Sequence, residues 1–364
     1  MHSSPTPKYD FLQQEKPVYS GADALTRLER WLTLQKNVSR IAVLCDRHTA
    51  QDCLPILLKV MPASIPVAEI VIEPGEHSKS LQVCQDIWQR LTQMDIGRED
   101  LLINLGGGVV SDIGGFVASA YLRGLRFVNV PTSLMAMTDA GLGGKTGVDL
   151  DHIKNRIGTI SFPECTVCFP GFLDTLPEVE WKSGAAEVFK HALIADPDLW
   201  KALAAHGCTP ESLAVMLQRI QRVKMEVVHI DPYEKGLRKI LNFGHSIGHA
   251  IESQSLSSSS VPLTHGQSVA IGMMLETEIS VRMQKLSNGE AEEIIQVLSH
   301  YFGKVNLCDY SVSDILKWMR YDKKNQKGEV KMSLLTGIGG CDWNIPVDEN
   351  LLADVLLHFG AKNN

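Results

Sequence analysis

Three segments in the second half of the chain carry side chains that can bind a divalent cation. Glu187 lies in an apolar run, His245 and His249 are four residues apart, and His265 follows a serine-rich stretch. A spacing of four places His245 and His249 on one face of a helix. One carboxylate with two or three imidazoles suits a divalent metal that keeps an open coordination position. The sequence therefore predicts a metal site. Hydrogen-bonded or surface histidines are the alternative, and the spacing does not choose between His245 and His249 as ligands.

A second group of residues is cationic, in a chain whose net charge is −7. Its members are Lys145, Lys154 (followed by Asn155), Lys190, Lys224, Arg238, Lys323 and Lys324. Lys145, Lys154 and Lys190 lie among small or apolar neighbours, where an unpaired ammonium would be costly. Arginine binds carboxylates through paired hydrogen bonds, whereas lysine binds phosphate as a point charge. The group predicts a small ligand with several negative charges. Solvated surface lysines are the alternative for Lys323 and Lys324.

A glycine-rich turn lies between a predicted strand and a predicted helix. Its sequence is Leu105-Gly106-Gly107-Gly108-Val109-Val110-Ser111-Asp112. Glycines let the backbone approach a phosphate, and a helix N-terminus offers free N–H groups and a partial positive charge. Asp46 ends another predicted strand, where a carboxylate can accept hydrogen bonds from ribose hydroxyls. These features predict a nucleotide site, to which the polar turn around Glu76 and Lys79 contributes. A tight turn, a helix cap at Asp46 and a solvated turn at Glu76 and Lys79 are the alternatives.

Strands and helices alternate in the first half of the chain, which predicts a parallel sheet with both faces covered. The predicted strands are 41–46, 67–72, 101–105 and 126–130, and the predicted helices are 80–94 and 113–122. The second half is predicted to be mostly helical, with helices over 178–194, 211–230, 240–253, 265–284, 290–302 and 313–321. We expect an α/β nucleotide-binding domain over residues 1–175 and an α-helical metal- and substrate-binding domain over 176–364, with a ligand cleft between them.

The composition is that of a globular protein. Hydrophobic residues make up 44% and charged residues 21% of the 364 residues, which excludes a disordered or fibrous chain. The acidic balance argues against nucleic-acid binding. Nothing in the sequence approaches the roughly 20 apolar residues that span a membrane, and no secretory signal is visible. Eight cysteines scattered through mostly apolar segments predict reduced thiols and a cytoplasmic location.

The chain resembles the 3-dehydroquinate synthases, within the sugar phosphate cyclase superfamily. The resemblance runs from about Asp46 to about Gly340 and rests on an ordered series of motifs. They are PGEHSK, GGGVVSD, YLRG, PTS, TDAGLGGKTGV, KN, AAEVFKHAL, GLR, LNFGHSIGHAIE, HGQ and DKK. The chain departs from the family pattern at Ser133, Gly141, Asp149 and Gln267, and none of these departures removes a predicted ligand or charge.

The resemblance implies a role for each matching residue. Zinc, for which cobalt can substitute, would be held by Glu187, His245 and His265. NAD would contact Asp46, Glu76, Lys79, Gly107, Gly108, Asp112, Thr132, Ser133, Lys145 and Lys154, with Phe172, Leu173, Asp174 and Thr175 closing over it. Substrate phosphate would bind Lys145, Asn155, Asn242, His249 and one of Lys323 or Lys324, and substrate carboxylate would bind Lys224 and Arg238. Asp139, Lys154 and Lys190 would line the site, and Arg123 would reach the phosphate of the neighbouring subunit in a homodimer.

The resemblance also implies a reaction of the shikimate pathway. The phosphorylated sugar acid 3-deoxy-D-arabino-heptulosonate 7-phosphate would become 3-dehydroquinate and phosphate. The steps would be transient oxidation by NAD, phosphate elimination, re-reduction and aldol cyclisation. The alternatives are another sugar phosphate cyclase and a metal-dependent oxidoreductase of the glycerol dehydrogenase kind.

Overall fold

A six-stranded parallel sheet forms the centre of the first half of the chain. The computed structural model describes residues 16–150, 153–259, 262–321 and 330–363, so Lys323 and Lys324 lie outside the described residues. The strand order is β1-β8-β5-β4-β2-β3. The strands are β1 (Val18–Ser20), β2 (Ile41–Asp46), β3 (Val67–Ile72), β4 (Leu101–Gly106), β5 (Arg126–Pro131) and β8 (Thr166–Cys168). The parallel sheet and its four longest strands confirm the prediction.

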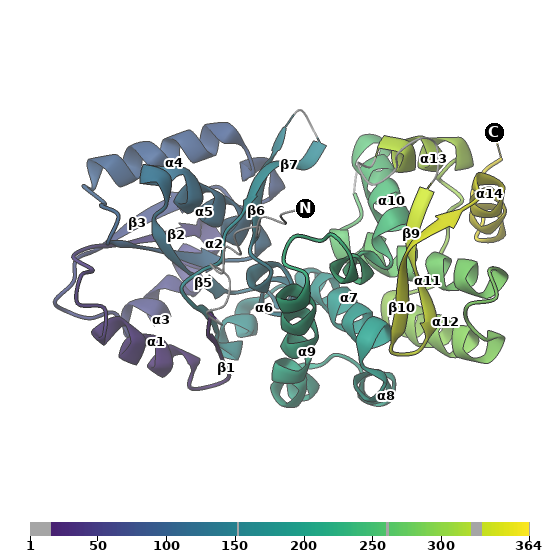
Figure 1. The fold of residues 1–364 in the computed structure, drawn as a ribbon, viewed down its shortest axis with the longest axis horizontal. Helices are drawn as coiled ribbons and strands as arrows, with labels where there is room; N and C mark the ends of the chain where they lie inside the picture. The colour runs from purple at the N-terminus through teal and green to yellow at the C-terminus, as the bar shows by residue number, and fades with distance from the viewer. Residues whose placement is uncertain (1–15, 151–152, 260–261, 322–329, 364) are drawn as a thin grey trace, which may run out of the picture.

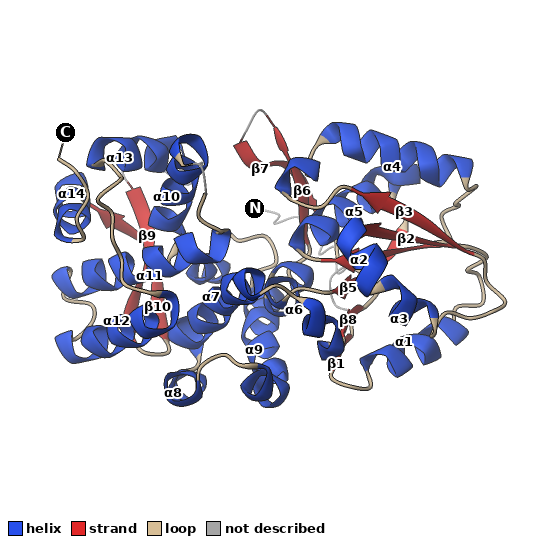
Figure 2. Ribbon diagram, turned by 180° about the vertical axis from the view of Figure 1, so that it is seen from behind, coloured by secondary structure: helices blue, strands red, loops and turns tan. Residues whose placement is uncertain are grey.

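Helices cover both faces of this sheet. Alternate residues of a strand point to opposite faces, and accordingly Ile41 and Val43 enter one hydrophobic cluster while Ala42 and Leu44 enter another. Helices α4 (Leu81–Gln93) and α5 (Gly108–Ala120) pack on one face, whereas α1 (Ala24–Thr33) and α3 (Leu54–Leu58) pack on the other (Figures 1 and 2). Short helices α2 (Arg47–Asp52) and α6 (Leu134–Thr138) follow β2 and β5.

The second half is mostly helical, as predicted. Its helices are α7 (Glu178–Ala195), α8 (Pro197–His206), α9 (Pro210–Ile230), α10 (His245–Ser258), α11 (His265–Arg282), α12 (Asn288–Phe302), α13 (Val312–Tyr321) and α14 (Glu349–His358). Residues of α7, α9 and α11 belong to the same hydrophobic cluster as Ile103, Val130 and Leu134 below the sheet. The two halves therefore share one core, and α7 lies between them in Figure 1.

Two hairpins were not predicted. Strands β6 (Lys145–Leu150) and β7 (Ile153–Ile160) pair antiparallel and pack against α5. Strands β9 (Val330–Gly337) and β10 (Gly340–Val347) also pair antiparallel. Their register shifts between Asp342 and Ile345, around the left-handed Asn344, so the sequence lacks a regular two-residue alternation there.

Two helix boundaries differ from the prediction. The segment predicted as one helix from Ile240 contains a 3₁₀ turn (Leu237–Asn242), a break at Gly244 with φ of 79°, and then α10. Helix α5 begins at Gly108 and not at Ile113, because the glycines that suggest a loop form its first turns.

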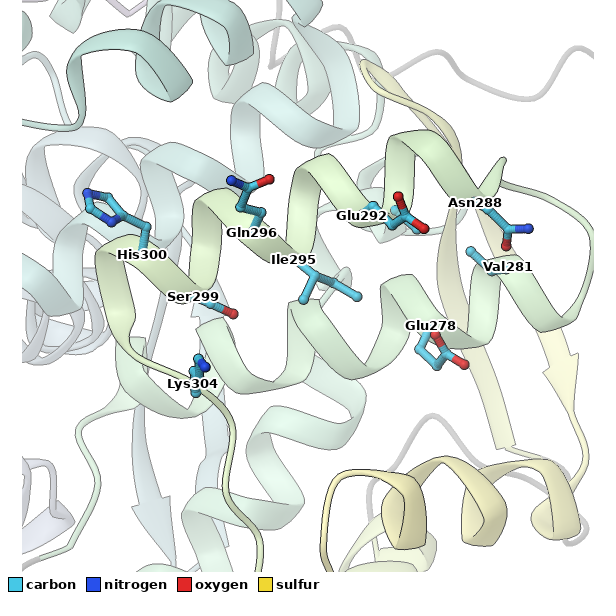
Figure 3. A pocket seen from close by; sticks show the side chains of 10 residues that line it. Glu278, Val281, Asn288, Glu292, Ile295, Gln296, Ser299, His300 and Lys304 are labelled. Atoms are coloured by element: carbon cyan, nitrogen blue, oxygen red, sulfur yellow. The ribbon is translucent and has the colours of Figure 1, made fainter.

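A groove of about 740 Å³ lies between α11 and α12 (Figure 3). It is lined by acidic and basic side chains in similar number, including Glu278, Glu292, His300 and Lys304, and by none of the predicted site residues that the structure describes. In the described part of the chain, no helix combines the length and apolarity that crossing a bilayer requires.

Candidate active site

Helix α7 carries the predicted ligand Glu187 through the centre of the molecule. Every residue from Ser183 to Ile194 is buried, which is the pattern of a helix surrounded by other elements. The start of α11 packs directly on it, because a Cβ on Gly266 would lie 2.1 Å from the carbonyl oxygen of Ser183. The hydroxyl of Ser183 also accepts a hydrogen bond from the N–H of Gly266 at 3.0 Å. This contact brings His265 next to α7.

Helices α10 and α11 pack through their backbones. A Cβ on Gly272 would lie 1.9 Å from the carbonyl oxygen of Gly244, so only glycine fits at this crossing. Gly244 takes a left-handed φ of 79° as the residue before α10, and His245 is the first residue of that helix. Gly248 packs in the same way on the backbone of Ser268, so the two helices run close together over two turns, and the ring centroids of His245 and His265 lie 5.5 Å apart.

Glu187, His245 and His265 come together from these three helices. The Oε1 atom of Glu187 lies 3.4 Å from Nε2 of His245 and 3.6 Å from Nε2 of His265. A ligand nitrogen of His249 also lies within 4.8 Å of those of His245 and His265. The structure thus gathers every metal-binding candidate of the sequence, with both Nε2 atoms directed at one carboxylate oxygen. One hard oxygen and two imidazole nitrogens fit a divalent metal.

The outer nitrogens of two histidines are held by hydrogen bonds. Nδ1 of His245 donates to the carbonyl oxygen of Phe243 at 3.1 Å, and Nδ1 of His265 donates to Glu252 at 3.2 Å. These acceptors favour the tautomer that carries its proton on Nδ1, and in that tautomer Nε2 has the free lone pair that binds a metal. Glu252 also accepts from Lys154 at 2.7 Å, so the imidazole of His265 is oriented by a carboxylate that is itself paired.

The buried charges of this cluster support each other. Burial alone would raise the pKa of Glu187, but Lys190 and His245 outweigh it and hold that pKa well below the usual range. Burial would lower the pKa of His265, yet hydrogen bonds to Glu187 and Glu252 raise it to about 9. His265 lies between the carboxylates of Glu187 and Glu252, so this part of the site favours a positive charge. That preference is the electrostatic requirement for binding a cation.

Asp139 is the anionic centre of an adjacent cluster. Its Oδ1 atom lies 2.8 Å from Nζ of Lys224, 3.0 Å from Nε2 of His191 and 3.7 Å from Nζ of Lys190. Lys190 also contacts Glu187 through an ion pair and therefore joins the two clusters. Burial opposes ionisation of Asp139, but Lys224 and Lys190 hold its pKa well below the ordinary value. The carboxylate is ionised at neutral pH.

Lys224 and Arg238 flank Gly143. A Cβ on Gly143 would lie 2.8 Å from Nη2 of Arg238 and 3.2 Å from Cε of Lys224, so the glycine makes room for both cations. Arg238 is 1% exposed and donates to the carbonyl oxygens of Pro232 and Gly143. Its Nε–H has no hydrogen-bond partner among the described residues. A buried guanidinium beside a buried lysine suits an incoming carboxylate.

A carboxylate of the chain itself contacts two residues predicted to bind phosphate. Glu234 forms an ion pair with Lys145 and accepts a hydrogen bond from Nδ2 of Asn242 at 2.6 Å. It takes a left-handed φ of 56° in the segment before the 3₁₀ turn. Lys145 and Asn242 thus converge from β6 and from the helical half, with an anionic group between them.

The predicted nucleotide residues follow the carboxyl ends of the parallel strands. Asp46 is the last residue of β2 and caps α2 by accepting a hydrogen bond from the N–H of Thr49, so the helix cap that was the alternative for Asp46 is present. Gly107 and Gly108 begin α5 after β4, and a Cβ on Gly107 would meet the hydroxyl of Ser133 at 3.2 Å. Thr132 is buried next to Ser133, which caps α6. The edge therefore combines a helix N-terminus with hydroxyl and carboxylate groups.

Lys79 joins three other predicted residues at this edge. Its Nζ lies 2.9 Å from Asp112, 2.6 Å from Oδ1 of Asn155 and 3.7 Å from Glu76. Burial would lower the pKa of Lys79, but Asp112 and Glu76 raise it, so this lysine is charged. Asn155, in the hairpin, therefore lies on the nucleotide side of the site.

Two predicted groups are not shown to join these clusters. Phe172 and Leu173 are buried in the hydrophobic core, whereas Asp174 and Thr175 are exposed in the turn after β8. Arg123 is exposed in a turn where both Leu122 and Arg123 have left-handed φ values, 51° and 66°.

Four residues that contact the site were not predicted from the sequence. They are Glu252, Glu234, His191 and Glu276. Glu252 closes the motif LNFGHSIGHAIE three residues after His249, and His191 directly follows Lys190. Helical spacing could have found Glu252, but Glu234 lies in an irregular segment that carries no periodic signal.

Family models and curated relatives match most of the chain. The model of the family "3-dehydroquinate synthase N-terminal" matches residues 69–183, and that of "3-dehydroquinate synthase C-terminal" matches residues 184–325. A 3-dehydroquinate synthase of Acidithiobacillus ferrooxidans is 37% identical and covers 91% of both chains.

Solved structures share the fold at lower identity. A 2-deoxy-scyllo-inosose synthase complexed with carbaglucose-6-phosphate, NAD+ and Co2+ has a TM-score of 0.84 at 23% identity, covering 94% of this chain and 96% of that one. A 2-epi-5-epi-valiolone synthase from Streptomyces hygroscopicus with NAD+ and Zn2+ bound has a TM-score of 0.84 at 25% identity, covering 99% of both.

The fold and the site define an enzyme with the architecture of the sugar phosphate cyclases. Its α/β half has a helix N-terminus at the carboxyl edge of a parallel sheet, and its helical half brings Glu187 next to His245 and His265. The chain belongs to the 3-dehydroquinate synthase family.

Proposed function

We propose that this enzyme of the 3-dehydroquinate synthase family works with NAD and one divalent metal ion, zinc in the first place and cobalt as a substitute. Its substrate is then 3-deoxy-D-arabino-heptulosonate 7-phosphate, and its products are 3-dehydroquinate and phosphate. The observation that carries the proposal is the convergence of Glu187, His245 and His265 beside buried Lys190, Lys224 and Arg238. The division into domains 1–175 and 176–364 is part of the proposal.

Glu187, His245 and His265 would hold the metal. When bound, a metal there polarises substrate hydroxyls and lowers their pKa, and NAD supplies a reversible hydride acceptor. The chain contributes the orientation of each ligand through Phe243 and Glu252. NAD would lie along the strand ends, in contact with Asp46, Gly107, Gly108, Thr132 and Ser133. A second group would lie nearby: Glu76, Lys79, Asp112, Lys145 and Lys154. The turn of Phe172, Leu173, Asp174 and Thr175 would close over the far side of the nucleotide.

Lys224 and Arg238 would hold the substrate carboxylate. The buried Nε–H of Arg238 offers a donor that the chain does not use within its described part. Phosphate would bind Lys145, Asn155, Asn242 and His249, together with Lys323 or Lys324. The Glu234 carboxylate already contacts Lys145 and Asn242 and would repel a phosphate bound at the same groups, so we expect phosphate binding to move Glu234 away.

The buried cluster around Asp139 would supply fixed charges next to the substrate. Lys190 lies between Asp139 and Glu187 and is positioned to stabilise negative charge that develops on substrate oxygens. His249 is a candidate for relaying a proton to or from the substrate phosphate. The remaining residues act by fixing the substrate against the nucleotide and by excluding water.

The assembly is proposed to be a cytoplasmic homodimer. The exposed Arg123 would reach the phosphate in the neighbouring subunit, and the cytoplasmic location rests on eight free cysteines, six of them buried. Mixing an Arg123→Ala chain with a His245→Ala chain tests the shared site, because hybrid dimers would recover one intact site. Recovered activity supports the arrangement, and no recovery from a mixture shown to exchange subunits contradicts it.

The central test is a turnover assay. Purified protein with the heptulosonate phosphate, NAD and zinc is expected to release dehydroquinate and phosphate in equal amounts. No net rise in NADH absorbance is expected, because the cofactor is returned to its oxidised form. Steady NADH formation would indicate a glycerol dehydrogenase-like reaction. Turnover of a substrate that lacks a carboxylate would indicate another sugar phosphate cyclase. The two buried cations Lys224 and Arg238 argue against that alternative, because they suit a carboxylate.

A further inference from the structure

A continuous series of charged contacts links the predicted metal ligand His265 to the predicted nucleotide residues. His265 Nδ1 lies 3.2 Å from Glu252, and the other oxygen of Glu252 lies 2.7 Å from Nζ of Lys154. Lys154 lies 3.7 Å from Glu76, which in turn lies 3.7 Å from Nζ of Lys79. The series crosses from α11 and α10 in the helical half to the hairpin and the sheet edge in the α/β half.

Glu252 is the member that joins the two halves. It is 4% exposed, and its two oxygens are divided between the halves, with Oε2 on His265 and Oε1 on Lys154. The carboxylate thus has an imidazole on one oxygen and an ammonium on the other. Because a buried carboxylate needs compensating charge, the orientation of His265 depends on where Lys154 lies.

Lys154 is shared between two acids. Its Nζ is 1.0 Å closer to Glu252 than to Glu76, at 2.7 Å against 3.7 Å, so Glu252 has the stronger contact and Glu76 competes for the same ammonium. A nucleotide whose hydroxyls donate to Glu76 would weaken that competition. Lys154 would then pair more completely with Glu252, which would hold the His265 ring more firmly as a ligand.

We propose that Glu252 is a positioning residue that orients His265 for the metal and, through Lys154, couples metal binding to nucleotide binding. The inference rests on the proposed function, since it requires both ligands to bind. Coupling between sites is reciprocal, so NAD would tighten metal binding and the metal would tighten NAD binding by the same factor.

The test is a set of zinc affinities measured by chelator competition, with and without saturating NAD, and NAD affinities measured by calorimetry. In the unaltered chain, NAD is expected to tighten zinc binding by about 5-fold or more. Glu252→Gln is expected to weaken zinc binding by about 10- to 100-fold, as is typical when a partner of a ligand is lost, and to abolish the effect of NAD.

Lys154→Met separates the two roles. It keeps the contact between Glu252 and His265, so zinc binding without NAD should fall less than in Glu252→Gln, whereas the effect of NAD on zinc binding should disappear. Glu178→Gln is the matched control, because Glu178 forms an exposed ion pair with Lys182 on the same helix as Glu187. Its zinc affinity and its response to NAD should equal those of the unaltered chain.

The outcomes separate the inference from the proposed function. An unaltered chain that binds zinc and NAD independently overturns the inference alone, as does Lys154→Met with an undiminished response to NAD. Glu252→Gln with unaltered zinc affinity also overturns it. An unaltered chain that binds neither ligand overturns the proposed function and the inference together.

Discussion

The carboxylate of Glu276 accepts a hydrogen bond from the backbone N–H of Gly244 at 2.7 Å. A second hydrogen bond comes from the N–H of Ile247 at 3.1 Å. Both N–H groups belong to the start of α10, where Gly244 has no side chain that could cap the helix. The fully buried Glu276 on α11 therefore caps the N-terminus of α10, next to His245.

Glu276→Ala should destabilise the protein and weaken metal binding. It would leave two buried N–H groups without their acceptor, which costs about 3 kcal/mol in the free energy of unfolding. Denaturant unfolding measures this cost, and chelator competition measures the accompanying loss of zinc affinity. Glu278→Ala on the same helix removes only a surface pair with Arg282 and should change stability by about 0.5 kcal/mol or less. Similar stabilities for the two variants would rule out the capping role.

Gly143→Ala should raise KM for the substrate and leave zinc affinity unchanged. Its Cβ would lie 2.8 Å from Nη2 of Arg238, so the guanidinium would have to shift from the carboxylate-binding position. A displacement of this size at a binding group costs about 10-fold or more in substrate affinity. Steady-state kinetics give the change. Gly289→Ala is the control, because a Cβ there meets nothing within 4 Å. Unchanged KM in Gly143→Ala would argue against Arg238 as a substrate contact.

Substrate affinity should fall as the pH rises through about 8. Burial lowers the pKa of Lys224 to about 8, despite the nearby Asp139. The ammonium that binds the carboxylate is therefore mostly present at pH 7 and reduced to about one tenth at pH 9. Asp139 and Lys190 keep their charges over this range, because the pKa of the first is lowered and that of the second is raised.

The measurement for this pH dependence is KM from pH 6.5 to 9.5. We expect a rise above pH 8 in the unaltered chain and a flatter profile in Lys224→Arg, whose guanidinium stays charged. A KM that is constant to pH 9.5 in the unaltered chain would show that Lys224 does not bind the carboxylate as a cation.

His245→Ala should lose the metal, and His249→Ala should retain it. Nε2 of His245 lies 3.4 Å from Glu187, and its Nδ1 is held by the carbonyl of Phe243, so this ring is prepared as a ligand. Removal of a ligand should weaken zinc binding by about 100-fold or more, beyond the cost of losing a partner of a ligand. Metal analysis after dialysis decides the question, and equal losses in both variants would make His249 a ligand as well.

The regular elements could be predicted because their patterns are local. Strand β2 is a short apolar run and helix α7 is a longer segment with apolar residues at helical spacing, and their observed bounds differ little from the predicted ones. The hairpin of β9 and β10 was missed because Asn344 and the register shift remove its alternation. The start of α10 was missed because the break depends on the left-handed Gly244. This glycine packs against Val269 and Met273 of α11, which are distant in the sequence.

The same difference between local patterns and long-range packing decides which site residues could be predicted. The sequence named Glu187, His245 and His265, and the structure brings them together. It did not name Glu252 or Glu276, because their partners lie on other elements and only the three-dimensional packing brings them into contact. The assignments of Asp46 and Lys79 to the nucleotide remain predictions, although both lie at the expected sheet edge.

The contact between the backbones of Gly244 and Gly272 limits how this centre could be redesigned. Because main-chain atoms touch there, the separation of the helices that carry His245 and His265 cannot be tuned by exchanging side chains. A single substitution at this crossing could not adjust the distance between the ligands slightly to suit an ion of another size. Selectivity would have to change through the chemical type of the ligands, which makes this scaffold resistant to gradual drift in metal preference.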